Sequence, residues 1–438
     1  MNYLNETDKY KENLVSDLKR LISIDSVLTE FNSENEFPFG KGIQEALVWM
    51  LELGEKDGFR IKNIDNYAGY IEFGTGPVFA VLCHLDVVPV GRDWTFDPFG
   101  GEVVDGKMYG RGTNDDKGPT MAAYYAMKML KDYGFKPNMT IRMILGTDEE
   151  TGWRGIKHYF KKEGMPNLGF APDAEFPLIY AEKGIHTFNA TGSDVKIPYF
   201  KSGERYNMVP DSAECKLNIN LEEEFEAYLK ENSYEGSIEN GLYKIIGKSA
   251  HAMDPTKGVN ACTLLAKFLY DHIESDFLKA VLQFDTDGSI LGVDYLDEEM
   301  GPLTMNLGFA SLENNEYTIG VNNRIPQGWD RFDELEEKVN SFSKYINVEN
   351  IPLHYISKED DLVKTLMKSY RKYTGDTVNQ PITIGGGTYA RALTKAVAFG
   401  PLMPEREEVA HQKDEYMHLG DLYTACAIYA DAMYNITK

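Results

Sequence analysis

The sequence is poor in cysteine and contains no long apolar run. Its four cysteines among 438 residues are far apart and mostly lie in apolar surroundings, which indicates reduced core thiols and no disulfide framework. No stretch approaches the ~20 apolar residues of a membrane span. The segment Met1–Glu6 lacks the basic and apolar regions of a secretory signal. We therefore expect a cytoplasmic protein that does not associate with membranes.

Positive charge is also scarce, since 45 lysines and arginines face 69 aspartates and glutamates, for a formal net charge of -24. Such a chain would be repelled by the phosphates of nucleic acid, which excludes nucleic acid as a partner. Most of the acidity is typical of a solvated surface. A smaller part could belong to a metal site, where a cation neutralises clustered carboxylates.

The length exceeds that of one ordinary core and predicts two domains. Helical and strand patterns alternate over the first ~180 residues, which favours an α/β domain with a mixed, largely parallel sheet and flanking helices. Strand-like segments interleaved with helices then predict an inserted α+β domain. We expect a discontinuous catalytic domain over 1–184 and 355–438, and a lid or substrate-binding domain over 185–354. The expected elements of the first part are strands over 69–73, 78–84, 103–109, 140–145 and 168–171, and helices over 119–130 and 155–162.

Candidate metal ligands follow the predicted strands, where ligands of such sheets gather. His84 ends the apolar run Val78–Cys83, and Asp86 is placed to orient its ring. The alternative for this pair is an ordinary surface turn. Asp115 and Asp116 lie in a glycine-rich turn before a predicted helix, where the alternative is helix capping.

The most distinctive local feature is a run of three acids, Asp148-Glu149-Glu150, directly after an apolar strand. Three adjacent carboxylates repel one another unless a cation is present, and adjacent glutamates allow one to bind metal while the other moves protons. A solvated acidic loop is the alternative. Asp173 follows another short apolar strand, and His411 precedes the last predicted helix. Taken alone, either residue could be structural.

In chain order, these residues resemble the M20 metallopeptidase family, most closely its bacterial dipeptidase V branch, which is carnosinase-like. The matching segments are Cys83–Pro89, Gly110–Gly118, Asp148–Gly152, Pro172–Asp173, and Ala410–Gln412 with Glu415. They span nearly the whole chain in the order of the family. The resemblance implies a zinc-exopeptidase-like catalytic domain carrying an inserted lid.

The resemblance also implies roles for individual residues. Asp115 would bridge two divalent ions, Asp86 would orient His84, and Glu149 would be the general base. Zinc suits two histidines and three carboxylates, and manganese or cobalt are alternatives. The implied ligands of the two ions are His84, Asp115, Glu150, Asp173 and His411.

Substrate contacts are implied in the inserted domain and near the glycine-rich turn. His251, in a Ser-Ala-His motif, would stabilise the oxyanion, with an ordinary loop histidine as the alternative. Asn207 would lie near substrate, and Arg324 would clamp a substrate carboxylate unless it is a surface arginine at a strand end. The turn that contains Gly386, Gly387 and Thr388 resembles the dipeptidase branch and would approach a small ligand closely; the alternative is a plain tight turn.

The expected function is metal-dependent hydrolysis of dipeptides and other short unblocked peptides. One alternative is a deacylase of the same family that acts on N-acyl amino acids or succinyl-diaminopimelate. Another is an inactive relative that serves as a binding protein, although the complete set of ligands and base argues against it. The length of the insertion favours a monomer and leaves a homodimer open.

Overall fold

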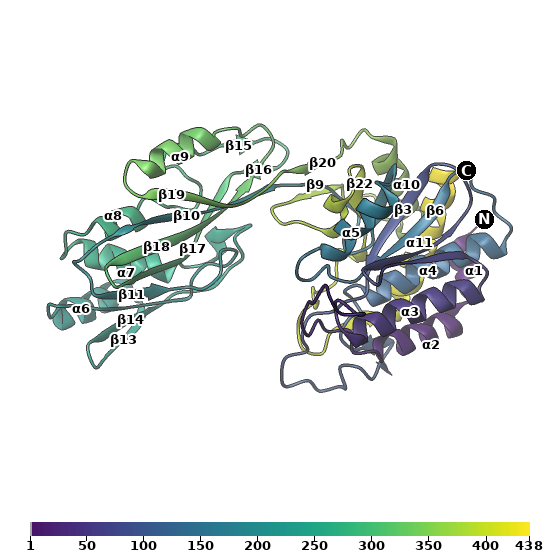
Figure 1. Ribbon diagram of the computed structural model, residues 1–438, viewed down its shortest axis with the longest axis horizontal. Helices are drawn as coiled ribbons and strands as arrows, with labels where there is room; N and C mark the ends of the chain where they lie inside the picture. The colour runs from purple at the N-terminus through teal and green to yellow at the C-terminus, as the bar shows by residue number, and fades with distance from the viewer. Residues whose placement is uncertain (1) are drawn as a thin grey trace. The chain divides into compact units, whose positions relative to one another are not determined.

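The computed structural model describes residues 2–438, which divide into two compact units (Figure 1). The first unit contains the chain up to Tyr180 together with Tyr355–Ile382 and Thr388–Lys438. The second contains Ala181–His354 and Thr383–Gly387. The second unit is thus an insertion into the first, and the short segment that carries the glycine-rich turn is grouped with it.

The first unit is built on a mixed sheet. Along this sheet the strand order is β1-β2-β6-β3-β7-β22-β9-β20, and β21 pairs with β9. The pairs β6–β3, β3–β7 and β7–β22 are parallel, whereas β1–β2, β2–β6 and β22–β9 are antiparallel. The predicted α/β class with a mixed sheet is confirmed. The strands are β1 (Arg60–Ile64), β2 (Ala68–Phe73), β3 (Val78–His84), β6 (Thr140–Gly146), β7 (Leu168–Ala171), β9 (Ile179–Glu182), β20 (His354–Tyr355), β21 (Ile382–Ile384) and β22 (Ala396–Ala398).

Helices cover both faces of this sheet. Tyr70 of β2 contacts Tyr159 of α5, whereas Phe73 of the same strand contacts Phe59, which in turn contacts Tyr124 of α4. Residues three apart on a strand point to opposite faces, so α5 and α4 lie on opposite sides. The helices are α1 (Tyr3–Thr7), α2 (Lys11–Ile22), α3 (Lys41–Lys56), α4 (Lys117–Asp132), α5 (Arg154–Glu163), α10 (Asp361–Thr374) and α11 (Leu419–Thr437), with a 3₁₀ turn η2 (Tyr389–Ala392).

One strand prediction in this unit was wrong. Residues 103–109 do not form a single strand, because β4 (Glu102–Val104) and β5 (Lys107–Tyr109) form an antiparallel hairpin. The turn residues Asp105 and Gly106 have φ angles of 49° and 75°, which the extended conformation of a strand excludes. The hairpin extends through β24 (Tyr416–His418) into a small sheet, and β8 (Ala174–Glu175) pairs with β23 (Pro401–Leu402).

The second unit is an antiparallel sheet with helices on one face. The strand order is β13-β14-β12-β11-β17-β18-β10-β19. Phe200 and Cys215 are buried in the core with α7 and α8, while their neighbours Lys201 and Glu214 lie on the opposite face. The elements are β10 (Gly184–Ser193), β11 (Tyr199–Ser202), β12 (Ser212–Lys216), α6 (Glu222–Asn232), β13 (Glu235–Glu239), β14 (Leu242–Ile246), η1 (Pro255–Lys257), α7 (Ala261–Tyr270), α8 (Asp276–Val281), β15 (Leu296–Asp297), β16 (Gly301–Pro302), β17 (Thr304–Glu313), β18 (Glu316–Ile325), α9 (Phe332–Asn340) and β19 (Lys344–Ile351).

The scarcity of cysteine and of long apolar runs in the sequence can now be compared with the structure. All four cysteines of the sequence lie in the described part of the chain, where each is buried and carries a free thiol. Between residues 2 and 438, the structure has no helix that combines the length and the apolar character needed to cross a membrane.

Candidate metal centre

The first unit brings the carboxyl ends of three neighbouring strands to one edge of its sheet. Strands β3, β6 and β7 are parallel, so their C-terminal ends share that edge. His84 is the last residue of β3, Glu149 and Glu150 follow β6, and Asp173 follows β7. The apolar strands are buried, which leaves the polar residues after them to form the rim.

Asp115 lies between two imidazoles in the loop that precedes α4. Its Oδ1 is 2.9 Å from Nε2 of His84, and its Oδ2 is 2.9 Å from Nε2 of His411. Each oxygen of one carboxylate thus faces a different histidine. This is the arrangement that a carboxylate bridging two cations requires.

The remaining acids complete two groups of ligand atoms. His84, Glu149 and Asp173 form one group, and Asp115, Glu150 and His411 form the other; within each group the ligand atoms lie within 4.8 Å of one another. Asp173 Oδ2 is 3.5 Å from His84 Nε2, and Glu150 Oε1 is 3.2 Å from His411 Nε2. All of the residues implied as ligands by sequence are therefore together.

These donors fit divalent cations. Nε2 of His84 and Oδ1 of Asp115 are buried and face each other, yet within residues 2–438 neither has a partner with hydrogen-bond geometry. Buried polar atoms that converge without hydrogen bonds are expected where a cation supplies the missing interaction. Imidazole and carboxylate donors suit zinc, and also manganese or cobalt.

Crowding and burial shift the protonation equilibria of the cluster. Burial raises the pKa of Glu149 well above its usual range, and the charge of Asp173 raises it further. Burial also raises the pKa of Asp115, but the neighbouring His411 and His84 outweigh it and hold that pKa below its usual range. The Asp115 and Glu150 carboxylates raise the pKa of His411 to about 11.

We expect metal loading to release protons. At pH 7 an imidazole with a pKa of about 11 carries its proton, which it must lose to bind a cation. The apparent metal affinity should therefore rise with pH, by about tenfold per pH unit for each proton released, and weaken as the pH falls. Titrating metal-stripped protein with Zn²⁺ or Mn²⁺ in buffers of different ionisation enthalpy should show the release of at least one proton, from His411. Binding heats that do not depend on the buffer would contradict this expectation.

Asp86 connects the first histidine to the acidic run. The backbone carbonyl of Asp86 lies 3.0 Å from His84 Nδ1, while its carboxylate is 3.6 Å away. That carboxylate accepts hydrogen bonds from the backbone N–H groups of Glu149 and Glu150, each at 3.1 Å. Asp86 therefore contacts both the ring of His84 and the backbone of the two glutamates.

A buried ion pair, between two residues for which the sequence predicted no role, contacts the backbone of Asp115. Arg111 Nη1 lies 2.6 Å from Glu415 Oε2, and both side chains are almost inaccessible. Glu415 Oε1 accepts the backbone N–H groups of Asn114 (2.8 Å) and Asp115 (3.2 Å), while Arg111 Nη2 donates to the carbonyl of His411 at 3.3 Å. The pair thus holds the backbone of Asp115 and of His411. Both residues stand in the matched segments, but only their contacts indicate what they do.

The two remaining acids of the site region have other partners. Asp116, the residue before α4, accepts the backbone N–H of His84 at 3.0 Å and the hydroxyl of Thr120 at 3.1 Å. Asp148 binds Arg154 through both carboxylate oxygens, at 2.6 and 2.7 Å. The three consecutive acids therefore differ in their surroundings, because Glu149 and Glu150 face the cluster and Asp148 faces an arginine.

The residues predicted to contact substrate are divided between the units. Asn207, His251, Arg324, Gly386 and Gly387 belong to the second unit, whereas Thr388 belongs to the first. Arg324 is buried; its Nε donates to Asn322 and its Nη1 to the carbonyl of Gly385. The alternative of a surface arginine is therefore wrong. The hydroxyl of Thr388 accepts the N–H of Ala390 at the start of η2.

His251 has a defined tautomer. The backbone N–H of Met253 donates to its Nδ1 at 3.2 Å, which leaves Nε2 to carry the proton of the neutral ring. Burial lowers the pKa of His251, and the positive charge of Arg324 lowers it further. At neutral pH this ring is thus a neutral donor through Nε2.

Comparisons with known proteins agree with this fold. The family model described as peptidase family M20/M25/M40 matches residues 80–435. The chain is 42% identical to "Putative dipeptidase YtjP" of Bacillus subtilis, with both chains covered in full, and 40% identical to "Putative dipeptidase SH1171" of Staphylococcus haemolyticus, with 98% of each covered. The crystal structure of human carnosine dipeptidase 1 superposes with a TM-score of 0.61 at 14% identity, covering 99% of this chain and 98% of that one, which supports the fold alone. The chain therefore belongs to peptidase family M20/M25/M40 and is a hydrolase of peptide bonds.

Proposed function

We propose that the protein hydrolyses dipeptides and other short peptides with free termini, using a water molecule activated by two divalent cations. The proposed ligands are His84, Asp115, Glu150, Asp173 and His411. One observation carries this proposal. The two oxygens of Asp115 each lie 2.9 Å from a different imidazole, at the centre of a cluster that Glu150 and Asp173 complete.

Two bound cations would polarise the peptide carbonyl and lower the pKa of water. Glu149 is the proposed general base, which takes the proton of the attacking water and returns it to the leaving amine. Its position within the cluster and its raised pKa support this role, because a base must accept and then release a proton near neutral pH. Asp86 and Glu415 hold the backbones of Glu149 and Asp115 through the hydrogen bonds described above.

The proposal assigns two further roles to the second unit. Arg324 binds the C-terminal carboxylate of the substrate, supported by a guanidinium that Asn322 and Gly385 hold in place. His251 donates its Nε2 proton to the developing oxyanion, supported by its tautomer and lowered pKa. Asn207, Gly386, Gly387 and Thr388 remain predicted substrate contacts.

The proposal also includes the identity of the metal and the cellular location of the protein. Zinc is the first choice, with manganese and cobalt as alternatives. A cytoplasmic location is supported by the buried free thiols, which are typical of reducing compartments.

A substrate panel tests the function. Metal-loaded protein should hydrolyse unblocked dipeptides, and chelation should abolish turnover until metal is restored. The same dipeptides with an acylated N-terminus or an amidated C-terminus should be poor substrates. Faster hydrolysis of N-acyl amino acids or of succinyl-diaminopimelate would instead assign the protein as a deacylase of the same family.

A further inference from the structure

Within the second unit, two loops are connected by hydrogen bonds between their backbones. The first loop carries Asn207 and the second loop carries His251. The N–H of Val209 donates to the carbonyl of Ala250 at 2.8 Å, and the N–H of Ala252 donates to the carbonyl of Asn207 at 2.9 Å. Met208 and His251 are therefore paired as in an antiparallel ladder. A displacement of either loop would be transmitted to the other.

Asn306 of β17 binds the first loop on both sides of Asn207. Its Nδ2 donates to the carbonyl of Tyr206 at 2.8 Å and to the carbonyl of Met208 at 3.0 Å. The side chain is 1% exposed, and its Oδ1 has no hydrogen-bond partner among residues 2–438. The opposite amide orientation would place Oδ1 against two carbonyl oxygens, so the two acceptors determine the orientation.

Thr304 lies two residues before Asn306 on β17 and points the same way, and Gly308, where the register of this strand shifts, also contacts the loop of Asn207. The Thr304 hydroxyl donates to the carbonyl of Ala252 at 3.0 Å, which connects β17 to the second loop. At Gly308, a Cβ atom would lie 2.4 Å from the carbonyl oxygen of Arg205. Glycine is therefore required for the first loop to approach β17 this closely.

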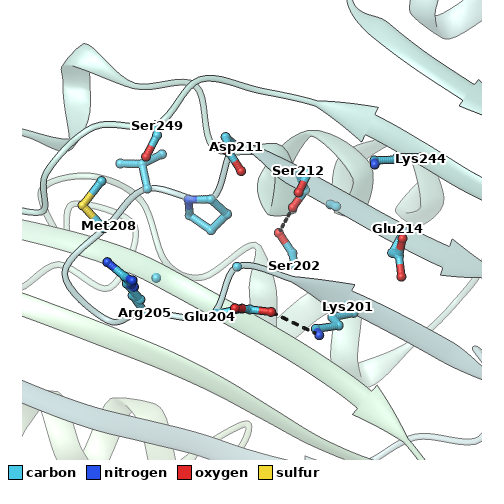
Figure 2. A pocket seen from close by; sticks show the side chains of 15 residues that line it. Lys201, Ser202, Glu204, Arg205, Met208, Asp211, Ser212, Glu214, Lys244 and Ser249 are labelled. Atoms are coloured by element: carbon cyan, nitrogen blue, oxygen red, sulfur yellow. Dashed lines mark hydrogen bonds and ion pairs between the residues drawn. The ribbon is translucent and has the colours of Figure 1, made fainter. Parts of the chain in front are cut away.

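The first loop also faces open space. A pocket of about 430 Å³ in the second unit is lined by Arg205, Met208, Asp211 and Ser249, which belong to the two loops (Figure 2). The backbone around Asn207 is therefore held by the hydrogen bonds from Asn306 of β17 and by its pairing with the loop of His251.

We propose that Asn306 is a positioning residue, which holds the loops of Asn207 and His251 as one rigid block for catalysis. The inference rests on the proposed function, because it gives these two residues a part in peptide hydrolysis. Asn306 would act by holding the backbone of the first loop, because its side-chain amide donates hydrogen bonds to the two carbonyls that flank Asn207.

The test compares Asn306→Leu with a matched control, Asn323→Leu. Asn323 lies on the adjacent strand β18, is also fully buried with an unpartnered Oδ1 among the described residues, and has its Nδ2 3.2 Å from Nδ1 of His186. We expect Asn306→Leu to lower kcat for a dipeptide by about 10- to 100-fold while metal content stays unchanged. Asn306→Ser keeps one donor and should lose less. Equal loss in Asn306→Leu and Asn323→Leu would overturn the proposal.

Two further measurements separate positioning from general destabilisation. In a double-mutant cycle, Asn306→Leu should slow the His251→Ala variant less than it slows the wild-type protein, because one of the two residues to be positioned is gone. Hydrogen exchange at the N–H groups of Val209 and Ala252 should accelerate by about tenfold in Asn306→Leu and stay unchanged in Asn323→Leu. The exchange measurement needs no activity, so unchanged exchange would reject the positioning role even if the wild-type protein failed to hydrolyse dipeptides.

Discussion

Replacing Glu149 by glutamine should lower kcat for dipeptide hydrolysis by roughly 10²- to 10⁴-fold while the protein still binds two cations. Glutamine keeps the shape of the side chain but cannot accept the proton of the attacking water. The ligand set proposed above does not include Glu149, so metal content should be retained. Turnover by metal-loaded protein and metal analysis after gel filtration measure the two quantities.

The neighbouring acids provide matched controls. Glu150→Gln alters a proposed ligand 3.2 Å from His411 and should reduce both metal content and turnover. Asp148→Asn affects the contact with Arg154 and should leave the catalytic step largely intact. Near-normal turnover in Glu149→Gln would exclude Glu149 as the base, and loss of metal in that variant would make it a ligand.

The second large effect is expected from Arg111→Met, which should lower the free energy of unfolding by about 3–5 kcal/mol. The substitution leaves Glu415 buried without its positive partner. It also removes the donor to the carbonyl of His411, so the apparent metal affinity should fall as well. Urea denaturation of the metal-free protein and metal titration measure the two effects.

The stability loss in this variant should depend on pH. Burial raises the pKa of Glu415 to about 7, and the nearby charge of Asp115 raises it too, while Arg111 opposes both. A carboxyl group whose folded-state pKa exceeds its unfolded value binds a proton on folding, so stability falls as the pH rises from about 4.5 through the folded-state pKa. Without Arg111 the pKa of Glu415 rises further. The free energy of unfolding that Arg111→Met loses relative to the wild-type protein should therefore be greater at pH 8 than at pH 5.

An exposed ion pair is the control for this substitution. Arg20 and Glu45 are 2.9 Å apart with side chains that are 49% and 55% exposed. Arg20→Met should cost less than about 1 kcal/mol, because solvent already screens the pair. An Arg111→Met protein that is as stable as the Arg20→Met protein would show that the buried ion pair is not needed for stability.

Much of the catalytic fold follows from local patterns. The segments 78–84 and 140–145 were predicted as strands, and they correspond to β3 and β6, because long apolar runs are typical of strands buried on both faces. The helix expected over 119–130 is the core of α4. The prediction failed at 103–109, where the turn at Asp105 and Gly106 separates two short strands. Apolar content alone does not reveal a turn within such a short segment.

The candidate site, like the fold, was predicted only in part from the sequence. His84, Glu149, Glu150 and Asp173 were found from sequence because each follows an apolar strand, and parallel strands bring such residues to one edge. Their role as metal ligands or base stays a proposal that the variants test. Thr388 was predicted beside Gly386 and Gly387, but the fold assigns it to the other unit, where its hydroxyl accepts the N–H of Ala390.

Local order in the chain thus indicated which side chains are candidates for the chemistry, because strand ends and glycine turns are short-range features. Which groups hold those side chains in place was decided only when distant segments met. Arg111 and Glu415 are 304 positions apart, and Asn306 contacts Tyr206 across 100 positions. A buried charge or amide is stable only beside its partner, and which partner that is depends on how the whole chain packs.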